Sequence, residues 1–203
     1  MTAGIFDNRK YVEGGAAVID QVNENLSASW MASLLAVDGD TASMALERLS
    51  NIPNSTTHMV LSVGGNDALN CLPSLEGSAT SLKQGLGWLC KIQTEFRASY
   101  KALIDALQSR GKPLMVCTIY DRVPGMPKEL ATALGLFNDV ILGEAIRHGL
   151  PVLDLRMICT EPGDYSAVSP IEPSSLGGAK IAHSMVNAIA QHDFCERRCV
   201  VYA

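Results

Sequence analysis

Two polar turns, each of which follows an apolar run, carry the residue types that could do chemistry. Asp38-Gly39-Asp40-Thr41 ends the run 30–37, and Gly64-Gly65-Asn66-Asp67 follows the run 58–63. The Asn66 side chain offers a neutral NH₂ donor, and the glycines beside it let the backbone turn tightly and let a substrate approach. A plain structural role is the alternative, in which Gly64-Gly65 ends a strand and Asn66 caps the next helix.

A third polar segment, Ser169-Pro170-Ile171-Glu172-Pro173-Ser174, precedes the last predicted helix. Glu172 could activate a hydroxyl or a water, but an exposed glutamate with a pKa of about 4.3 is a weak base, and only burial would raise that pKa. The alternative is a first-turn acid that the helix dipole favours. Ser62 lies inside a strand, and capping explains Ser174 and Ser175 better than nucleophilicity does. Further polar residues on this rim, to which spacing assigns no role, are Asp67, Tyr120, Asp121, Asp154, Glu161 and Asp164.

Strand-like and helix-like segments alternate along the chain and must position these turns. The predicted strands are 30–37, 58–63, 114–119 and 150–155. The predicted helices, with apolar residues at helical spacing, are 14–26, 41–49, 88–107, 128–148 and 176–190. Buried strands separated by helices imply a parallel sheet covered on both faces, and ligands of such sheets bind at the carboxyl ends of the strands.

The turn at Gly39, the Gly-Gly-Asn-Asp sequence at 64–67 and the opening Gly4-Ile5-Phe6-Asp7-Asn8 resemble the SGNH hydrolases, also called GDSL esterases and lipases. The resemblance covers essentially the whole chain. It implies an α/β fold, a three-layer α/β/α sandwich with a parallel sheet of the SGNH-hydrolase, flavodoxin-like type. It also implies hydrolysis of small acyl esters, in which the Gly39 N–H and the Asn66 amide hold the negative oxygen of the transition state. Such donors are worth about 2.7 to 4 kcal/mol each.

The chain departs from this family at two catalytic positions. Gly4 stands where the family has its nucleophilic serine, and a glycine cannot attack a carbonyl. Ser169-Pro170-Ile171-Glu172 falls on the family's Asp-x-x-His signature, so Glu172 replaces the histidine base. We therefore expect an esterase that is impaired or inactive as written. The alternative is a non-catalytic pseudoenzyme or ligand-binding scaffold of the same fold.

None of the four histidines is expected to replace the missing base. His58 and His148 precede predicted strands and should lie at the amino ends of the sheet. His183 lies eleven residues beyond Glu172, on the order of 16 Å along a helix, and His192 is farther still. Hydrogen-bond reach is only about 3 Å.

The amino end lacks the strand that leads into the nucleophile in the family. We expect one domain over 1–192 without its first strand, followed by a tail at 193–203. Three explanations stay open. The first is that the native chain starts upstream of Met1. The second is that the strand is truly absent from a degenerate protein. The third is that the apolar segment 199–203 fills the vacant position in the sheet between the predicted strands 30–37 and 58–63.

Charge and composition limit which binding partners and which cellular compartment are expected for this protein. Sixteen basic and 21 acidic side chains give a net charge of −5, with no basic cluster beyond Arg197-Arg198, which argues against nucleic acid and anionic membranes. No apolar run approaches the roughly 18 residues that span a bilayer, and no secretory signal opens the chain, which predicts a cytoplasmic protein. Buried thiols are the expected state of the six cysteines. His192, Cys195 and Cys199 lack a second ligand pair at zinc spacing, so we expect no metal or organic cofactor.

Overall fold

Four parallel strands, paired in chain order, form the sheet of the computed structural model, which describes residues 4–203. They are β1 (Met59–Leu61), β2 (Leu114–Cys117), β3 (Val152–Leu153) and β4 (Val201–Tyr202). In register, Val60 faces Met115, Val116 faces Val152, and Val152 faces Val201. β1, β2 and β3 consist of buried residues only, as expected for strands that are covered on both faces.

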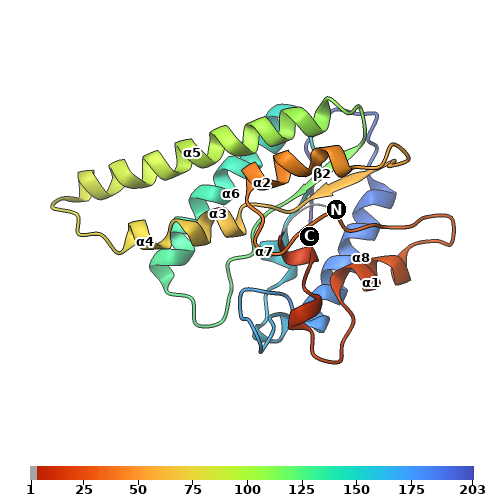
Figure 1. Cartoon of the computed structure of the whole chain (residues 1–203), viewed down its shortest axis with the longest axis horizontal. Coiled ribbons are helices and arrows are strands. Elements are labelled where there is room, and N and C mark those ends of the chain that lie inside the picture. The colour runs from red at the N-terminus through yellow and green to blue at the C-terminus, as the bar shows by residue number, and fades with distance from the viewer. Residues whose placement is uncertain (1–3) are drawn as a thin grey trace.

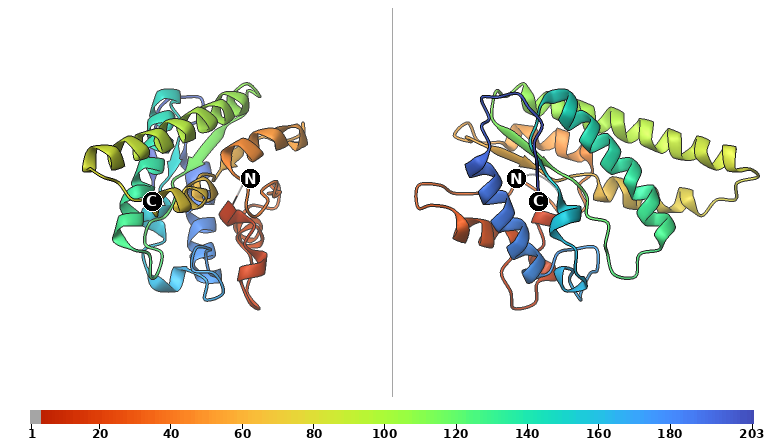
Figure 2. Two further views of the ribbon diagram at one scale, coloured as in Figure 1. Left: turned by 60° about the vertical axis from the view of Figure 1, so that its left-hand side comes forward. Right: turned by 180° about the vertical axis from the view of Figure 1, so that it is seen from behind.

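Helices cover the two faces of the sheet and give three layers, as predicted (Figures 1 and 2). The helices on one face are α2 (Ala42–Glu47), α5 (Leu82–Gln108) and α6 (Lys128–His148), and those on the other are α1 (Val18–Asn25) and α8 (Ser175–Gln191). Side chains of a strand point alternately to the two faces. Along β2, Leu114 and Val116 therefore join the core beneath α5 and α6, while Met115 and Cys117 join the core beneath α1 and α8.

Short helical turns connect these elements. They are η1 (Gly4–Phe6), η2 (Arg9–Tyr11), η3 (Arg48–Asn51), α3 (Gly65–Asn70), α4 (Leu72–Leu75), α7 (Leu155–Ile158) and η4 (Pro162–Asp164). The sequence prediction contained none of them as separate elements. Two of them, α3 and α4, follow β1 directly and form one side of the cleft described below.

The segment 30–37 is not a strand, which corrects the prediction. Its backbone is held instead by Asn23, whose side chain accepts from Ala32 N at 2.8 Å and donates to Ala32 O at 3.1 Å. Met31 is 84% exposed. In the described part of the chain, β1 pairs with β2 alone, and a cavity of about 310 Å³ separates its other side from this segment. An apolar run without a neighbouring strand has no ladder to join, so it stays extended but unpaired.

The tail 193–203 ends in a strand, β4, that pairs with β3, which corrects the alternative that this segment takes the place of the missing strand beside β1. Val201 and Tyr202 pair with Val152 and Leu153, at the edge of the sheet opposite β1. The Tyr202 hydroxyl lies 3.0 Å from His192 Nδ1, which anchors the tail to the end of α8.

Helix α5 begins six residues earlier than its apolar periodicity suggested. The Ser81 hydroxyl accepts from Gln84 N at 3.2 Å, and the Gln84 side chain accepts from Thr80 N at 2.6 Å. This reciprocal capping fixes the start of the helix despite Gly85 and Gly87 in its first turns. The Ser-x-x-Gln spacing was the sequence signal for it.

Candidate active site

The two glycine turns meet at the carboxyl end of β1. The Asn66 side chain donates to the Asp40 carbonyl at 3.1 Å, and the Asp67 carboxylate accepts from Ala42 N at 3.0 Å. Asp67 therefore holds the start of α2 against α3, while Asn66 lies beside the Gly39–Asp40 turn. The Asn66 amide thus contacts the residue that follows Gly39, and the donor roles of Gly39 and Asn66 stay predictions.

Special backbone geometry and one ion pair fix these turns. Gly39 has a φ of +90° and Gly64 a φ of +115°, values that side-chain-bearing residues rarely adopt. A Cβ at Gly64 would also lie 3.0 Å from the Phe96 ring. Asp40 is 2% exposed and pairs with Arg48 at 2.9 Å. The charge under the Gly39 turn is thereby compensated.

The opening segment connects the Gly39 turn to the Glu172 segment. The Asp7 carboxylate accepts from Asp38 N at 3.2 Å. The buried Asn8 side chain donates to Pro173 O at 3.0 Å and accepts from Val18 N at 2.9 Å. These bonds hold the segment that follows η1 against the rim. Ile5 lines the same cleft as Asn66 and Glu172.

Glu172 is buried, which contradicts the alternative of an exposed first-turn acid. It precedes α8 in a turn closed by Glu172 N to Ser169 O at 2.9 Å, and it is 8% exposed. Burial, with smaller contributions from the Asp38 and Asp7 carboxylates, raises the pKa of Glu172 to about 7. Its Oε2 has no hydrogen-bond partner among the described residues. A carboxylate with this pKa is a competent general base near neutral pH.

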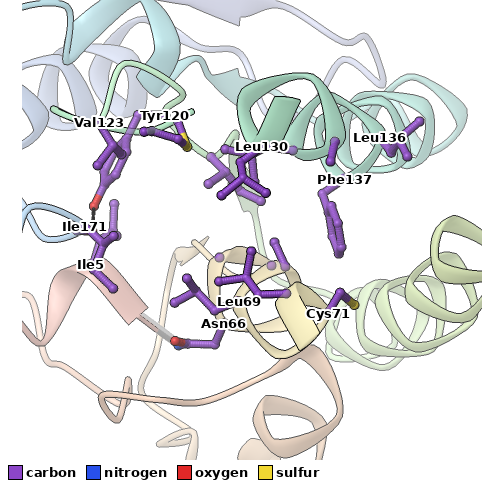
Figure 3. A pocket seen from close by; sticks show the side chains of 18 of the residues that line it. Ile5, Asn66, Leu69, Cys71, Tyr120, Val123, Leu130, Leu136, Phe137 and Ile171 are labelled. Atoms are coloured by element: carbon purple, nitrogen blue, oxygen red, sulfur yellow. Dashed lines mark hydrogen bonds between the residues drawn. The ribbon is translucent and has the colours of Figure 1, made fainter. Parts of the chain in front are cut away.

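Ile5, Asp40, Asn66 and Glu172 line a cleft of about 350 Å³ with a polar end and an apolar end, whereas Gly39 is not among the residues that line it. Figure 3 shows Asn66, Ile5 and Ile171 at one end, and Phe137, Leu136 and Cys71 at the other. The Tyr120 hydroxyl donates to the Ile171 carbonyl at 2.5 Å and holds the Glu172 segment over the cleft. Burial raises the pKa of Tyr120 well above its ordinary value, so the group stays a neutral donor.

No histidine lines this cleft in the described part of the chain. His58 contacts Trp30 and Phe194 in the groove beside β1, and His148 lies 3.6 Å from Glu144 at the end of α6. His183 lies beside Asn187 on an exposed face of α8.

Most of the other polar candidates have structural partners and do not themselves line the cleft. Asp154 accepts from the Thr118 hydroxyl at 2.7 Å and pairs with Arg156. Asp164 is buried against Lys180, at 2.7 Å. Neither of these acids, nor Asp121 or Glu161, lines the cleft.

The three candidate serines have different surroundings. Ser62 lines the cleft directly after β1. Ser174 caps α8, as predicted, by accepting from Gly177 N at 3.1 Å. The Ser175 carbonyl accepts from the Gln21 side chain at 3.0 Å and so ties α8 to α1.

The cysteines are all free thiols in the described residues. Cys117 and Cys159 are buried, and burial raises the pKa of the Cys159 thiol to about 12. Cys195 is exposed, and Cys199 packs partly against the core beneath α5. Over residues 4–203, no three His, Cys, Asp or Glu side chains gather as metal ligands. No helix of this range is long and apolar enough to cross a bilayer.

Some supporting residues were not identified from the sequence. Asp7 and Asn8 were noted only as part of a resemblance, yet they connect three segments of the rim. Tyr11 was overlooked, although its hydroxyl donates to Asp38 at 2.8 Å. No local spacing announces such contacts, because their partners are distant along the chain.

A parallel sheet that helices cover on both faces, with polar turns at the carboxyl ends of its strands, gives the SGNH-hydrolase type of α/β fold. The chain belongs to the GDSL-like lipase/acylhydrolase family, whose model matches residues 1–177. No curated protein matches it by sequence.

Solved structures of lipolytic enzymes share the fold. The acetyl xylan esterase AlAXEase is 19% identical with a TM-score of 0.67, over 93% of this chain and 100% of that one. The lipase Lip_vut3 from a goat rumen metagenome is 15% identical with a TM-score of 0.71, over 92% and 94%. A lipolytic G-D-S-L protein from Veillonella parvula is 13% identical with a TM-score of 0.67, over 94% and 96%. At these identities the likeness establishes the fold.

Proposed function

We propose that the chain is an esterase scaffold for small acyl esters whose hydrolytic activity is impaired because Gly4 takes the nucleophile position. The observation that carries this proposal is the bond from Asn66 to the Asp40 carbonyl, which sets an amide donor beside the Gly39 turn. Fixed donors of this kind stabilise the oxyanion of acyl transfer. Glycine at residue 4 leaves this machinery without a hydroxyl at the position that the family uses for its nucleophile.

The expected chemistry with a hydroxyl at residue 4 is ordinary acyl transfer. The hydroxyl oxygen attacks the ester carbonyl carbon, and Glu172 takes its proton. Gly39 N–H and Asn66 Nδ2–H hold the carbonyl oxygen while it carries the negative charge. The intermediate then expels the alcohol, which recovers the proton, and water releases the acid in a second cycle of the same kind. Glu172 serves this role because burial places its pKa near neutrality.

The test compares p-nitrophenyl acetate hydrolysis by the chain as written and by a Gly4→Ser variant. We expect turnover to appear in Gly4→Ser, and to fall by about 10² to 10³ in kcat when Asn66→Ala is added. Asn70→Ala, an exposed asparagine at the end of α3, is the matched control and should leave turnover unchanged.

Two results would contradict the proposal in different ways. Hydrolysis by the chain as written that is lost on Asn66→Ala would show an active enzyme. Loss of that hydrolysis in Ser62→Ala would then show that the serine that lines the cleft supplies the hydroxyl. No turnover in a folded Gly4→Ser variant would favour the second candidate, a ligand-binding scaffold, for which the preserved cleft is the supporting observation.

A further inference from the structure

Strand β1 is buried, although no strand of the described chain pairs with its outer side. On the inner side, Met59 N donates to Pro113 O at 2.8 Å. The N–H and C=O groups of successive strand residues point to opposite sides, so those of Val60 point toward the groove of about 310 Å³ beside β1. Backbone groups in a buried place need hydrogen-bond partners, because an unpaired group costs stability.

Apolar side chains from both halves of the core line this groove. Val22, Met185 and Ile189 belong to the core beneath α1 and α8, and Ile52 and Leu107 belong to the core beneath α5 and α6. Side chains of a strand point alternately to the two faces of a sheet. A strand in the groove would therefore bury apolar side chains at every position.

The side of the groove opposite β1 is formed by an extended segment. Trp30, Ala32 and Leu35 line it from the segment 30–37, whose backbone Asn23 holds through Ala32. The groove thus lies between two extended backbones, which is the position of a middle strand in a sheet. A polypeptide backbone fits this position better than a compact ligand does.

The groove selects an uncharged occupant. None of the described residues that line it is an aspartate, glutamate, lysine or arginine. His58 lines it, and its Nδ1 is buried without a hydrogen-bond partner among the described residues. Burial lowers the pKa of His58, so the ring is neutral at neutral pH. A charged side chain of the occupant would be buried here without a counter-ion, at a cost of several kcal/mol by the general rule for unpaired buried ions.

We propose that the groove beside β1 binds an extended, uncharged, apolar segment of another polypeptide, which joins the sheet as a strand next to β1. The main chain of Val60 supplies hydrogen bonds, and the apolar lining takes the side chains on both faces. β1 has three residues, so a segment of about four residues at about 3.3 Å each matches its length. The site is separate from the cleft that holds Asn66 and Glu172, because no described residue lines both.

The probe is the synthetic peptide acetyl-Lys-Gly-Val-Ile-Val-Ile-Gly-Lys-amide, whose lysines stay in solvent at both ends. Isothermal titration of the unmodified chain should show one peptide bound per chain. Amide hydrogen exchange should slow at least tenfold more at Val60 than at Val152, which already donates to Val200 O at 2.8 Å. The same peptide N-methylated at its four apolar residues keeps its side chains but has no N–H to donate there, so it should bind at least tenfold more weakly.

Substitutions on α8 test the location. Val186 lines the groove and is half-buried, so Val186→Glu places a charge there and should weaken peptide binding at least tenfold. Leu176→Glu, at an exposed leucine of the same helix that does not line the groove, is the control and should leave binding unchanged. Val186→Trp fills the groove without adding a charge and should weaken binding as well, which guards against a folding defect in Val186→Glu.

Several results would overturn the proposal. One is no binding of the peptide by the unmodified chain. Another is equal affinity for the N-methylated peptide, which would indicate an apolar cavity that does not pair with a strand. Unchanged binding in both Val186 variants would place the peptide elsewhere. A dimer in solution that the peptide does not dissociate would show that a second copy of the chain occupies the groove.

Discussion

Glu172→Gln should make the protein more stable above neutral pH. The carboxyl is buried and its pKa is raised from 4.5 to about 7, so the folded chain holds this proton more tightly than the unfolded chain does. The native protein then loses stability as the pH rises from about 4.5 to about 7. At about 1.4 kcal/mol for each pKa unit, the loss is about 3 kcal/mol. An amide cannot ionise, so the variant escapes this loss.

Urea unfolding at about pH 4.5 and about pH 8 measures the effect, since the free energy of unfolding falls linearly with urea. We expect Glu172→Gln to resemble the unmodified chain at the lower pH and to exceed it by up to about 3 kcal/mol at the higher pH. Glu13→Gln, at an exposed glutamate, is the control, and its stability should differ from that of the unmodified chain by the same amount at both pH values. A stability difference that is the same at both pH values would refute the reasoning.

Three further predictions concern the rim and the sheet edge. In the Gly4→Ser chain, kcat/KM for p-nitrophenyl acetate should rise with pH up to about 7 and then level, because Glu172 accepts a proton only as a carboxylate; a flat profile would exclude it as the base. Arg48→Met leaves Asp40 buried and unpaired, so urea unfolding should show a loss of about 1 to 3 kcal/mol, which Arg48→Lys should partly restore. Deletion of 200–203 removes the carbonyls of Val200 and Tyr202, which accept from Val152 N and Asp154 N. The free energy of unfolding should fall by about 1 to 3 kcal/mol for each lost bond. Unchanged stability would show that β4 contributes nothing.

The elements with a local signal were predictable. Helix α6 has the predicted bounds, Lys128–His148, because its apolar residues repeat along its whole length and Gly149 ends it in a left-handed conformation. The buried strands β1 to β3 were recognisable from short apolar runs between turns, although each is shorter than predicted. The strand predicted over 30–37 was wrong for a physical reason. An extended segment becomes a strand only when it pairs with a neighbouring strand, and the sequence of the segment alone does not show whether such a neighbour exists.

In the candidate site, too, residues with a local sequence signal were predictable, and features that depend on distant parts of the chain were not. Gly39 and Asn66 were predicted because each turn carries its own signature, and the structure brings the Asn66 amide to the Asp40 carbonyl next to Gly39. The burial of Glu172 depends on Tyr120 and Asn8, which hold the segment 171–173 from distant parts of the chain. Sequence could state that burial would make this glutamate a base, but only the packing decides that it is buried.

The hydrogen bonds that hold Asn66 and Asp67 do not depend on the residue at position 4. Asn66 is oriented by the Asp40 carbonyl, and Asp67 holds the start of α2. None of these contacts involves residue 4, so a substitution there should leave Asn66 and Asp67 in place. A scaffold whose donors depended on the nucleophile would lose both together. This independence is why a single substitution at Gly4 is a meaningful test of the proposed function, since it should add a hydroxyl without moving Asn66.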